Sequence, residues 1–256
     1  MTRRYRQRDQ LVLTRPIRAK VMPYKDTLAD VDYALQRDSA FSYLCNACSR
    51  CCHNKAIRVG PYEILRLARR LGMTTTEFIA KHTEAGGTVL RMRDENNRAC
   101  VFLGEKGCGV HPDRPLACRL YPLARWVDPD GQESFGHLTP HPKTEGVYGT
   151  GATIADYLDQ QGAAPFFDVG DRYGEVYQRM VERLEDLDAD ELQHRSSRRN
   201  DVDQTELGLA ASPWLDIDKT VSEFCQTNRR PMPADIEGAV AIHIEAIETW
   251  VASLGN

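Results

Sequence analysis

The sequence predicts an α+β protein in which a small, metal-stabilised, cysteine-rich domain with a β-hairpin and a helical hairpin precedes a mainly α-helical region. Two observations support this class. Seven of the eight cysteines lie between positions 45 and 118, among segments with short helical and strand patterns. After position 152, apolar residues recur mostly at helical spacing. We therefore expect a basic N-terminal extension over residues 1–35, a cysteine-cluster metal-binding domain over 36–145 and a mainly helical region over 146–256.

The overall composition argues against several classes of protein. The chain has 256 residues, of which 41% are apolar and 27% charged, and its net charge of −4 gives no general attraction to nucleic acid or to acidic membranes. No stretch approaches the roughly 18 apolar residues that a membrane-spanning helix needs. The residues after Met1 do not resemble a secretory signal. We expect a cytoplasmic protein without membrane or nucleic-acid partners, and the sequence leaves its oligomeric state open.

The densest cluster of cysteines lies at residues 45–52, where Cys45, Cys48, Cys51 and Cys52 follow the spacing C-x2-C-x2-C-C. A two-residue gap lets a tight turn direct two Sγ atoms toward one ion. Bacterial ferredoxins hold an iron–sulfur cluster with C-x2-C-x2-C, whereas zinc sites mostly use two separated C-x2-C pairs. Disulfides are rare in a reducing cytosol. The spacing therefore indicates a metal site, and it favours iron–sulfur over zinc.

Before and after this run, the expected elements are short. Residues 1–20 contain seven Arg or Lys and one Asp, so we expect a solvated arm with a short strand at Leu11–Leu13. A turn of helix is expected over 30–35. Pro61 and Gly72 mark the ends of a helix, and a second begins at the capping box Thr74-x-x-Glu77. The second helix lacks a basic face, so we expect a helical hairpin beside the metal site rather than a DNA-binding motif.

The next segments are expected to present three further cysteines. Strands are predicted at 88–93 and 99–103, with a turn at 104–107 before Cys108. Such a hairpin would bring Cys100 and Cys108 side by side. The prolines of segment 112–122 limit the conformers around Cys118, so less entropy is lost when that side chain is fixed.

The pattern of the second half of the chain predicts mainly helices. A turn at 128–131, a strand at 134–138 and a glycine-containing turn at 146–151 come first. Helices are expected at 154–158, 173–184 and 236–254, and the charged residues 192–206 predict a linker. Cys225 lies in a helical pattern and is expected to be a core residue, because a buried free cysteine behaves as a small hydrophobe.

These residues together resemble a known family, the CxxCxxCC proteins, described as a zinc- or iron-chelating domain. The resemblance covers roughly residues 40–125. It rests on Phe41-x-Tyr43, the cysteine run, Cys100-Val101-Phe102-Leu103, Cys108 and Arg114-Pro115-x-x-Cys118-Arg119. It implies that the metal ligands are Cys45, Cys48, Cys51, Cys52, Cys100, Cys108 and Cys118. It also implies a link to flagellin lysine-N-methylases, which look like iron–sulfur enzymes that use S-adenosylmethionine.

The sequence departs from the family at one place. Many members carry a further cysteine before the glycine loop, where this chain has Pro140-His141-Pro142-Lys143. His141 either replaces a thiolate ligand or is a surface loop residue. Because imidazole is neutral, its ligation would raise the potential of a cluster, as in Rieske centres. We keep His141 with the seven cysteines as a candidate ligand.

Three functions fit this pattern. Seven thiolates exceed the four that one zinc ion needs. The first hypothesis is therefore an iron–sulfur protein, of 4Fe-4S type, acting in redox chemistry or on a protein or peptide substrate. The second is a zinc-stabilised binding module without catalysis, and the third is metal storage or delivery. No S-adenosylmethionine motif and no acid–base pair is found, so catalytic residues stay unassigned. Arg114, Arg119 and Tyr121 either tune the centre through hydrogen bonds or serve as ion-pair and core residues.

Overall fold

The structure is a computed structural model that describes residues 31–95, 97–128, 130–194 and 213–254. The expected N-terminal arm and strand, and most of the expected linker over 192–206, lie outside the described residues. The α-helices are α1 (Pro61–Leu71), α2 (Thr75–His82), α3 (Leu116–Leu120), α4 (Ile154–Gln160), α5 (Ala164–His194), α7 (Ile217–Thr227) and α8 (Ile236–Ser253). Short 3-10 turns are η2 (Arg50–Cys52), η3 (Ala85–Gly87) and η4 (His111–Asp113).

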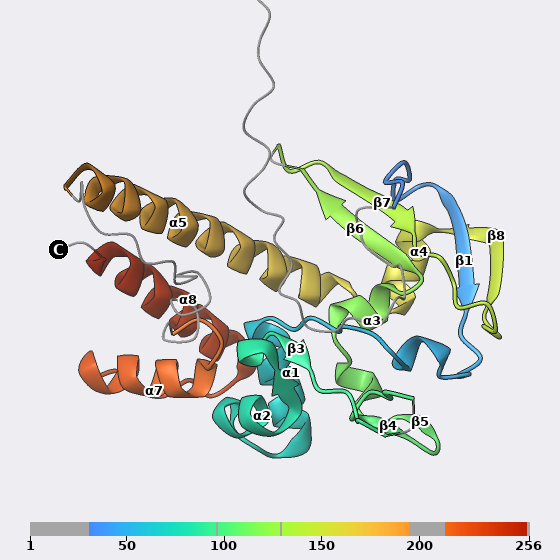
Figure 1. The fold of residues 1–256 in the computed structure, drawn as a ribbon, viewed down its shortest axis with the longest axis horizontal. Helices are drawn as coiled ribbons and strands as arrows, with labels where there is room; N and C mark the ends of the chain where they lie inside the picture. The colour runs from blue at the N-terminus through green and yellow to red at the C-terminus, as the bar shows by residue number, and fades with distance from the viewer. Residues whose placement is uncertain (1–30, 96, 129, 195–212, 255–256) are drawn as a thin grey trace, which may run out of the picture.

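The described strands form antiparallel pairs. They are β1 (Ala40–Leu44) with β8 (Val147–Thr153), β2 (Thr83–Glu84) with β3 (Val89–Leu90), β4 (Leu103–Gly104) with β5 (Gly107–Cys108), and β6 (Leu123–Val127) with β7 (Glu133–His137). In Figure 1 the larger pairs gather with α4 at one end of the molecule, while α5, α7 and α8 form the other end. This mixture of helices and small antiparallel sheets agrees with the predicted α+β class.

The helical hairpin α1–α2 is confirmed, and local sequence explains its ends. Pro61 occupies the first helical position of α1, and Gly72 closes that helix at φ 67°, a left-handed conformation suited to glycine. Thr74 accepts a hydrogen bond from the backbone N–H of Glu77, whose carboxylate accepts from the N–H of Thr74. Phe78 of α2 is fully buried. The hairpin is therefore specified largely by its caps and its apolar faces.

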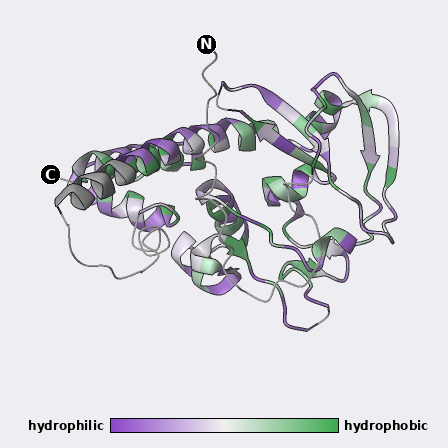
Figure 2. Cartoon of the chain, turned by 45° about the horizontal axis from the view of Figure 1, so that its top comes forward, coloured by the Kyte–Doolittle hydropathy of each residue, from purple (hydrophilic) through white to green (hydrophobic). Residues whose placement is uncertain are grey.

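The C-terminal helices pack against this hairpin through one shared core. Tyr62 and Leu65 of α1 belong to the same buried cluster as Val176 of α5, Ile217 of α7 and Val240 of α8. Hydrophobic and hydrophilic residues alternate along α5 in Figure 2, as expected for a helix with one buried face. Cys225 is 2% exposed in this cluster, which confirms its predicted core role.

Polar contacts also join the hairpin to α7. Asp218 accepts hydrogen bonds from the guanidinium of Arg69 and from the backbone N–H of Thr75, the latter at 2.8 Å. The Thr75 hydroxyl donates to Asp216 at 2.6 Å. The first turn of α2 and the first turn of α7 are thus held together by carboxylates that accept from backbone and side-chain donors.

Two expected elements are wrong. Residues 31–35 contain no helix, because Leu35 and Phe135 exchange backbone hydrogen bonds of 3.0 and 2.8 Å and hold this segment against β7. Residues 99–103 are not one strand. The N–H of Leu103 bonds back to the carbonyl of Cys100, so the chain turns there and the hairpin is confined to β4 and β5.

Other predictions hold in part. The strand expected at 88–93 is reduced to β3, and the strand at 134–138 is confirmed as β7. The helix expected at 173–184 is part of the much longer α5. Strand β8 replaces the glycine-containing turn. Gly149 faces Ser42 of β1 there, and a Cβ at Gly149 would come within 2.8 Å of the Ser42 Oγ. No helix in the described part of the chain is long and apolar enough to cross a membrane.

Candidate metal centre

The cysteine run forms a tight loop that follows β1. Ala47 and Ser49 adopt positive φ angles of 52° and 61°, and the N–H of Cys52 bonds to the carbonyl of Ser49 at 3.0 Å. The ring of His53 contacts that same carbonyl at 3.0 Å. This left-handed turn reverses the chain between the first and last cysteines of the run. The cysteine motif therefore forms a compact loop without a hydrophobic core of its own.

Cys51 and Cys52 form the closest pair of thiols. Their Sγ atoms lie 4.0 Å apart, near the roughly 3.8 Å that separates two sulfurs bound tetrahedrally to one zinc ion. The hydrogen bond from Cys52, followed by a backbone hydrogen bond and the positive charge of Lys55, lowers the pKa of Cys51 to about 7 despite partial burial. The same hydrogen bond and burial raise the pKa of Cys52. The pair thus contains one thiol that readily becomes a thiolate and one that holds its proton.

Backbone pairing brings Cys100 to this loop. Its N–H donates to the carbonyl of Cys52 at 2.7 Å, and the N–H of Asn54 donates to the carbonyl of Arg98 at 3.1 Å. Burial raises the pKa of the Cys100 thiol, and the nearby thiols of Cys108 and Cys51 raise it further. Cys100 and Cys108 therefore lie near each other, as predicted. In the hairpin, however, Cys108 pairs with Leu103 and not with Cys100.

Cys118 completes a group of five neighbouring thiols. It lies on α3, and burial raises its pKa, with further contributions from Cys100, Cys51 and Cys108. Charge on Cys118 in turn raises the pKa of Cys52. Five thiols from three separate segments of the chain thus lie close enough for charge on one to affect the pKa of another. We call Cys51, Cys52, Cys100, Cys108 and Cys118 the thiol group.

The remaining candidate ligands lie around the thiol group. Cys45 is exposed and Cys48 is half-buried in the same loop. His141 is half-buried, and its Nδ1 accepts a hydrogen bond from the N–H of Lys143 at 3.0 Å. The Asn46 side chain donates to the carbonyl of Glu145 at 2.7 Å, which ties the loop of His141 to the cysteine run.

The thiol side chains are chemically suited to bind a thiophilic cation. Metal ions bind thiolates, and a cation stabilises the charged form that burial and neighbouring thiols disfavour at Cys52, Cys100 and Cys118. Over the described ranges, however, no three Cys, His, Asp or Glu side chains are arranged to hold one ion. A bound metal would therefore require side chains of the thiol group to reorient toward it.

Tyr43 belongs to the motif that carries the family resemblance, but its place at the site was not predicted. Burial, together with the nearby Cys45, Tyr121 and Cys51, raises its pKa to about 12. Its ring lies 4.9 Å from that of Tyr148 and 6.2 Å from that of Tyr121. These rings form an aromatic wall beside the cysteine run. The sequence signal for the position of Tyr43 was the alternation of residues along β1, because Phe41 and Tyr43 share one face of the strand.

The arginines beside Cys118 have mainly structural contacts. Arg119 is 6% exposed, and its guanidinium donates to the carbonyls of Pro112, Arg114 and Gln161 while lying 4.3 Å from the Phe166 ring centre. Burial, and then the charge of Arg114, lower the pKa of Arg119 to about 10. Arg119 thus holds α3 and the loop before it in place.

Arg114 has a direct electrostatic effect on one of the thiols. Its guanidinium contacts the Nδ1 of His111 at 3.0 Å, and its positive charge partly offsets the raised pKa of Cys118. Burial, followed by the charges of Arg114 and Arg119, lowers the pKa of His111. Arg114 therefore favours the thiolate form of Cys118, as Arg93 does for Cys100.

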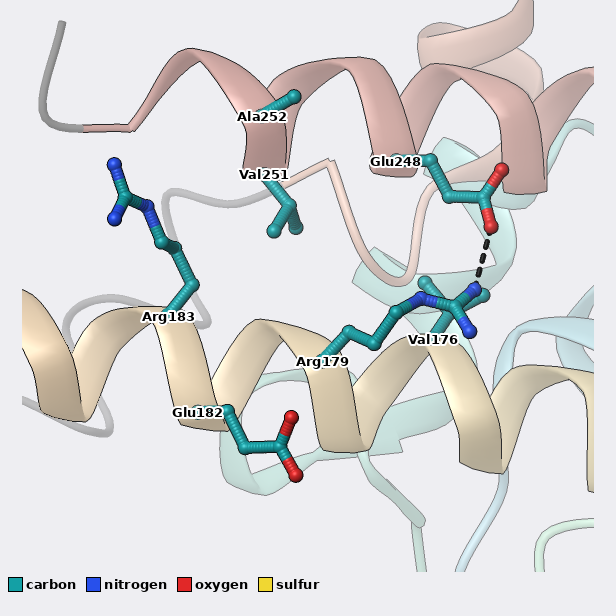
Figure 3. A pocket seen from close by; sticks show the side chains of 7 residues that line it. All are labelled: Val176, Arg179, Glu182, Arg183, Glu248, Val251 and Ala252. Atoms are coloured by element: carbon teal, nitrogen blue, oxygen red, sulfur yellow. Dashed lines mark hydrogen bonds and ion pairs between the residues drawn. The ribbon is translucent and has the colours of Figure 1, made fainter.

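Among the described residues, two of the cavities lie outside the thiol group. One, of about 560 Å³, is lined by Leu116, Ala117 and Leu120 of α3, by the start of α1 and by α5. The other, of about 570 Å³, lies between α5 and α8 (Figure 3). There Arg179 pairs with Glu248, and Arg183 donates to the carbonyl of Leu254 at 2.6 Å. The two arginines of the second cavity are thus already bound by the chain itself.

Comparison with known proteins supports metal binding. Residues 44–141 match the model of the CxxCxxCC family, described as "Putative zinc- or iron-chelating domain". The matched segment contains the seven cysteines and His141. The comparisons with curated proteins and with solved structures found no significant match. The family resemblance expected from the sequence is therefore confirmed for this segment, and the similarity to flagellin lysine-N-methylases is not confirmed.

Proposed function

We propose, from the match of residues 44–141 to a metal-chelating domain, that the cysteine module binds an iron–sulfur cluster. The observation that supports this is the thiol group itself, which brings five thiols from three chain segments near one another. Burial and neighbouring thiols disfavour the thiolate form of these side chains, and a bound cation would offset that cost. Metal binding would draw these side chains together and fix the three segments.

The number and kind of donors favour iron–sulfur over zinc. One structural zinc ion needs four ligands, and the thiol group alone holds five, with Cys45 and Cys48 in the same loop. When bound, an iron–sulfur cluster supplies one-electron transfer, and hydrogen bonds and nearby charges tune its potential. In this proposal Arg114 and Lys55 provide nearby positive charge, and the rings of Tyr43, Tyr121 and Tyr148 lie beside the cysteine run.

A protein or peptide substrate forms part of the proposal. Leu44 and Val147, which pair across β1 and β8, are 63% and 56% exposed, and Tyr148 beside them is 38% exposed. This apolar patch adjoins the exposed Cys45. Exposed apolar patches commonly mark interaction sites. A partner segment bound there would lie next to the metal centre, as redox chemistry or modification of a side chain requires.

A zinc-stabilised binding module is the second candidate. Cys51 and Cys52 have a sulfur separation close to that of a zinc pair. In that case the metal would stabilise the fold without chemistry, and the exposed patch would bind a partner.

The deciding experiment is metal and acid-labile sulfide analysis of anaerobically purified protein, with its visible absorption spectrum. We expect iron with matching sulfide and a broad absorption band in the visible range typical of thiolate-bound iron clusters. Zinc without sulfide would refute the iron–sulfur proposal and support the structural module. Protein free of both metals would refute both.

Matched variants test the ligand assignment. Cys118→Ala is expected to lose most of the bound metal, because it removes a member of the thiol group. Cys225→Ala is the control, since Cys225 is buried in a different core cluster. Equal metal content in the two variants would show that the thiol group is not the metal site.

A further inference from the structure

The 560 Å³ cavity between α1, α3, β6 and α5 has the features of a second, separate binding site. Its volume lies within the range of about 300–1,000 Å³ that is usual for small-molecule sites. Most of its lining residues are apolar or aromatic, as in such sites. Leu116 and Leu120 of α3 face it, whereas Cys118 of the same helix belongs to the thiol group.

Two glycines of α5 keep this cavity open. Gly170 and Gly174 are one helical turn apart, and both line the cavity. A Cβ added at either position would meet nothing within 4 Å, and neither glycine has a positive φ. Glycine is poorly suited to a helix interior, and neither internal packing nor backbone conformation requires it here. The cavity offers a reason for glycine at both positions, because a larger side chain would take up the space of a ligand.

Aromatic rings line the cavity and are held in place by the chain. The Tyr62 hydroxyl accepts from Arg66 at 3.0 Å, and the Tyr173 hydroxyl contacts the Nδ1 of His243 at 2.8 Å. The Trp214 ring centre lies 5.7 Å from that of Tyr173, at 79° between the planes. Rings fixed in this way offer a preformed apolar surface that favours stacking with another planar group.

The charge at the cavity favours an anion. Arg58 lines it and is exposed, and within the described residues it has no carboxylate partner. Arg125, the other arginine lining the cavity, is paired with Glu133 and Asp171. The carboxylate of Glu63 accepts from the backbone N–H of Gly60 at 3.0 Å and is thus used in capping α1. Arg58 is therefore the lining side chain whose charge no carboxylate of the described residues offsets.

We propose that this cavity binds a small planar aromatic acid. Its ring system would lie over the two glycines and against the tyrosine and tryptophan side chains, with its acidic group toward Arg58. This site is distinct from the thiol group and does not depend on the proposed metal chemistry.

Fluorescence titration of the full-length protein with anilinonaphthalene sulfonate, a planar aromatic anion, tests the site. We expect saturable binding to the wild type. Gly174→Leu fills the cavity from a position where the new side chain meets open space, and it should weaken binding by about tenfold or more. Gly174→Ala is the matched control, because a single methyl leaves most of the volume free.

The charge requirement is tested with a second pair of variants and a second probe. Arg58→Ala should weaken binding of the sulfonate by about fivefold. It should leave binding of phenylnaphthylamine, the uncharged analogue, unchanged. Arg70→Ala removes an exposed positive charge of α1 that does not line the cavity, so it should have no effect on either probe.

Three results would overturn the proposal: no saturable binding to the wild type, equal affinity in folded Gly174→Leu, or equal losses in Arg58→Ala and Arg70→Ala. If circular dichroism shows that Gly174→Leu does not fold, Gly170→Met places a side chain in the same cavity. Unchanged affinity in that variant would overturn the proposal in the same way.

Discussion

Acid should destabilise the protein through one buried histidine, His243 of α8. Its Nδ1 accepts a hydrogen bond from the Tyr173 hydroxyl, and its Nε2 donates to the carbonyl of Pro213, both at 2.8 Å. The side chain is 0% exposed. This arrangement uses both nitrogens of the neutral imidazole, joins α5 to α8 and holds the segment that precedes α7. A proton added to Nδ1 would have to be accommodated without solvent.

The size of the effect follows from the pKa shift. Burial is the main cause that lowers the pKa of His243 from 6.5 to about 4, and the hydrogen bond to Pro213 and the charge of Asp216 only partly oppose it. Between these values the unfolded chain binds one proton more than the folded protein, so stability falls as the pH falls from 6.5 toward 4. The full loss is about 3 kcal/mol. Above pH 6.5 this histidine contributes no pH dependence.

The assay is urea unfolding followed by circular dichroism at several pH values between 4 and 7.5. His243→Asn removes the titrating group, so its free energy of unfolding should vary less with pH than that of the wild type, by about 3 kcal/mol across this interval. Exposed His137 provides the control, and His137→Asn should retain the wild-type dependence. Parallel pH profiles for the wild type and His243→Asn would refute the reasoning.

Three further predictions concern the fold around the metal centre. Gly146→Ala places a Cβ within 2.4 Å of the Tyr43 ring, so it should lower the free energy of unfolding by about 1–3 kcal/mol, whereas Gly151→Ala, which meets nothing, should not. Thr74→Ala removes the cap of α2 and should cost about 1 kcal/mol in the same measurement. Arg119→Lys leaves carbonyl acceptors of the α3 loop unpaired, so it should lower the melting temperature more than Arg70→Lys. Equal melting temperatures for the two lysine variants would show that Arg119 does not hold this loop.

Local signals predicted the helices well. The ends of α1 and α2 depend on Pro61, Gly72 and the capping box of Thr74 and Glu77, which act within a few residues of one another. The burial of Cys225 also followed from the pattern of its own helix. Such features can be read from sequence because the interactions that produce them are local.

Strand β8 was missed because its determinants lie far away in the chain. Its sequence contains two glycines and reads as a turn, yet it pairs with β1 about a hundred residues earlier. Gly149 is explained only by its contact with Ser42. Long-range pairing also accounts for the extended segment at 31–35, which is held by Phe135. Nothing in either local sequence specifies its partner.

The seven cysteines and His141 stay predicted ligands, and the surroundings of the cysteine run were not predicted from the sequence. The spacing of the cysteines indicated metal binding, and the grouping of Cys100 with Cys108 followed from a hairpin signal. The contact of Tyr43 with the cysteine run depends on β1 and on the close approach of Gly146. Asn46 holds the loop of His141 through one hydrogen bond to the carbonyl of Glu145, about a hundred residues later in the sequence. Such contacts arise from tertiary packing.

The short helix α3 belongs to both proposed sites. Leu116 and Leu120 line the cavity, and Cys118 lies in the thiol group on a helix of only five residues. Cys118 lies two residues from each of these leucines, and Arg119 of the same helix is fixed by hydrogen bonds to carbonyls. If an occupant of the cavity shifts α3 and thereby strengthens metal binding tenfold, the metal must strengthen binding of that occupant tenfold. The affinities of the two sites would then be thermodynamically linked through a single turn of helix.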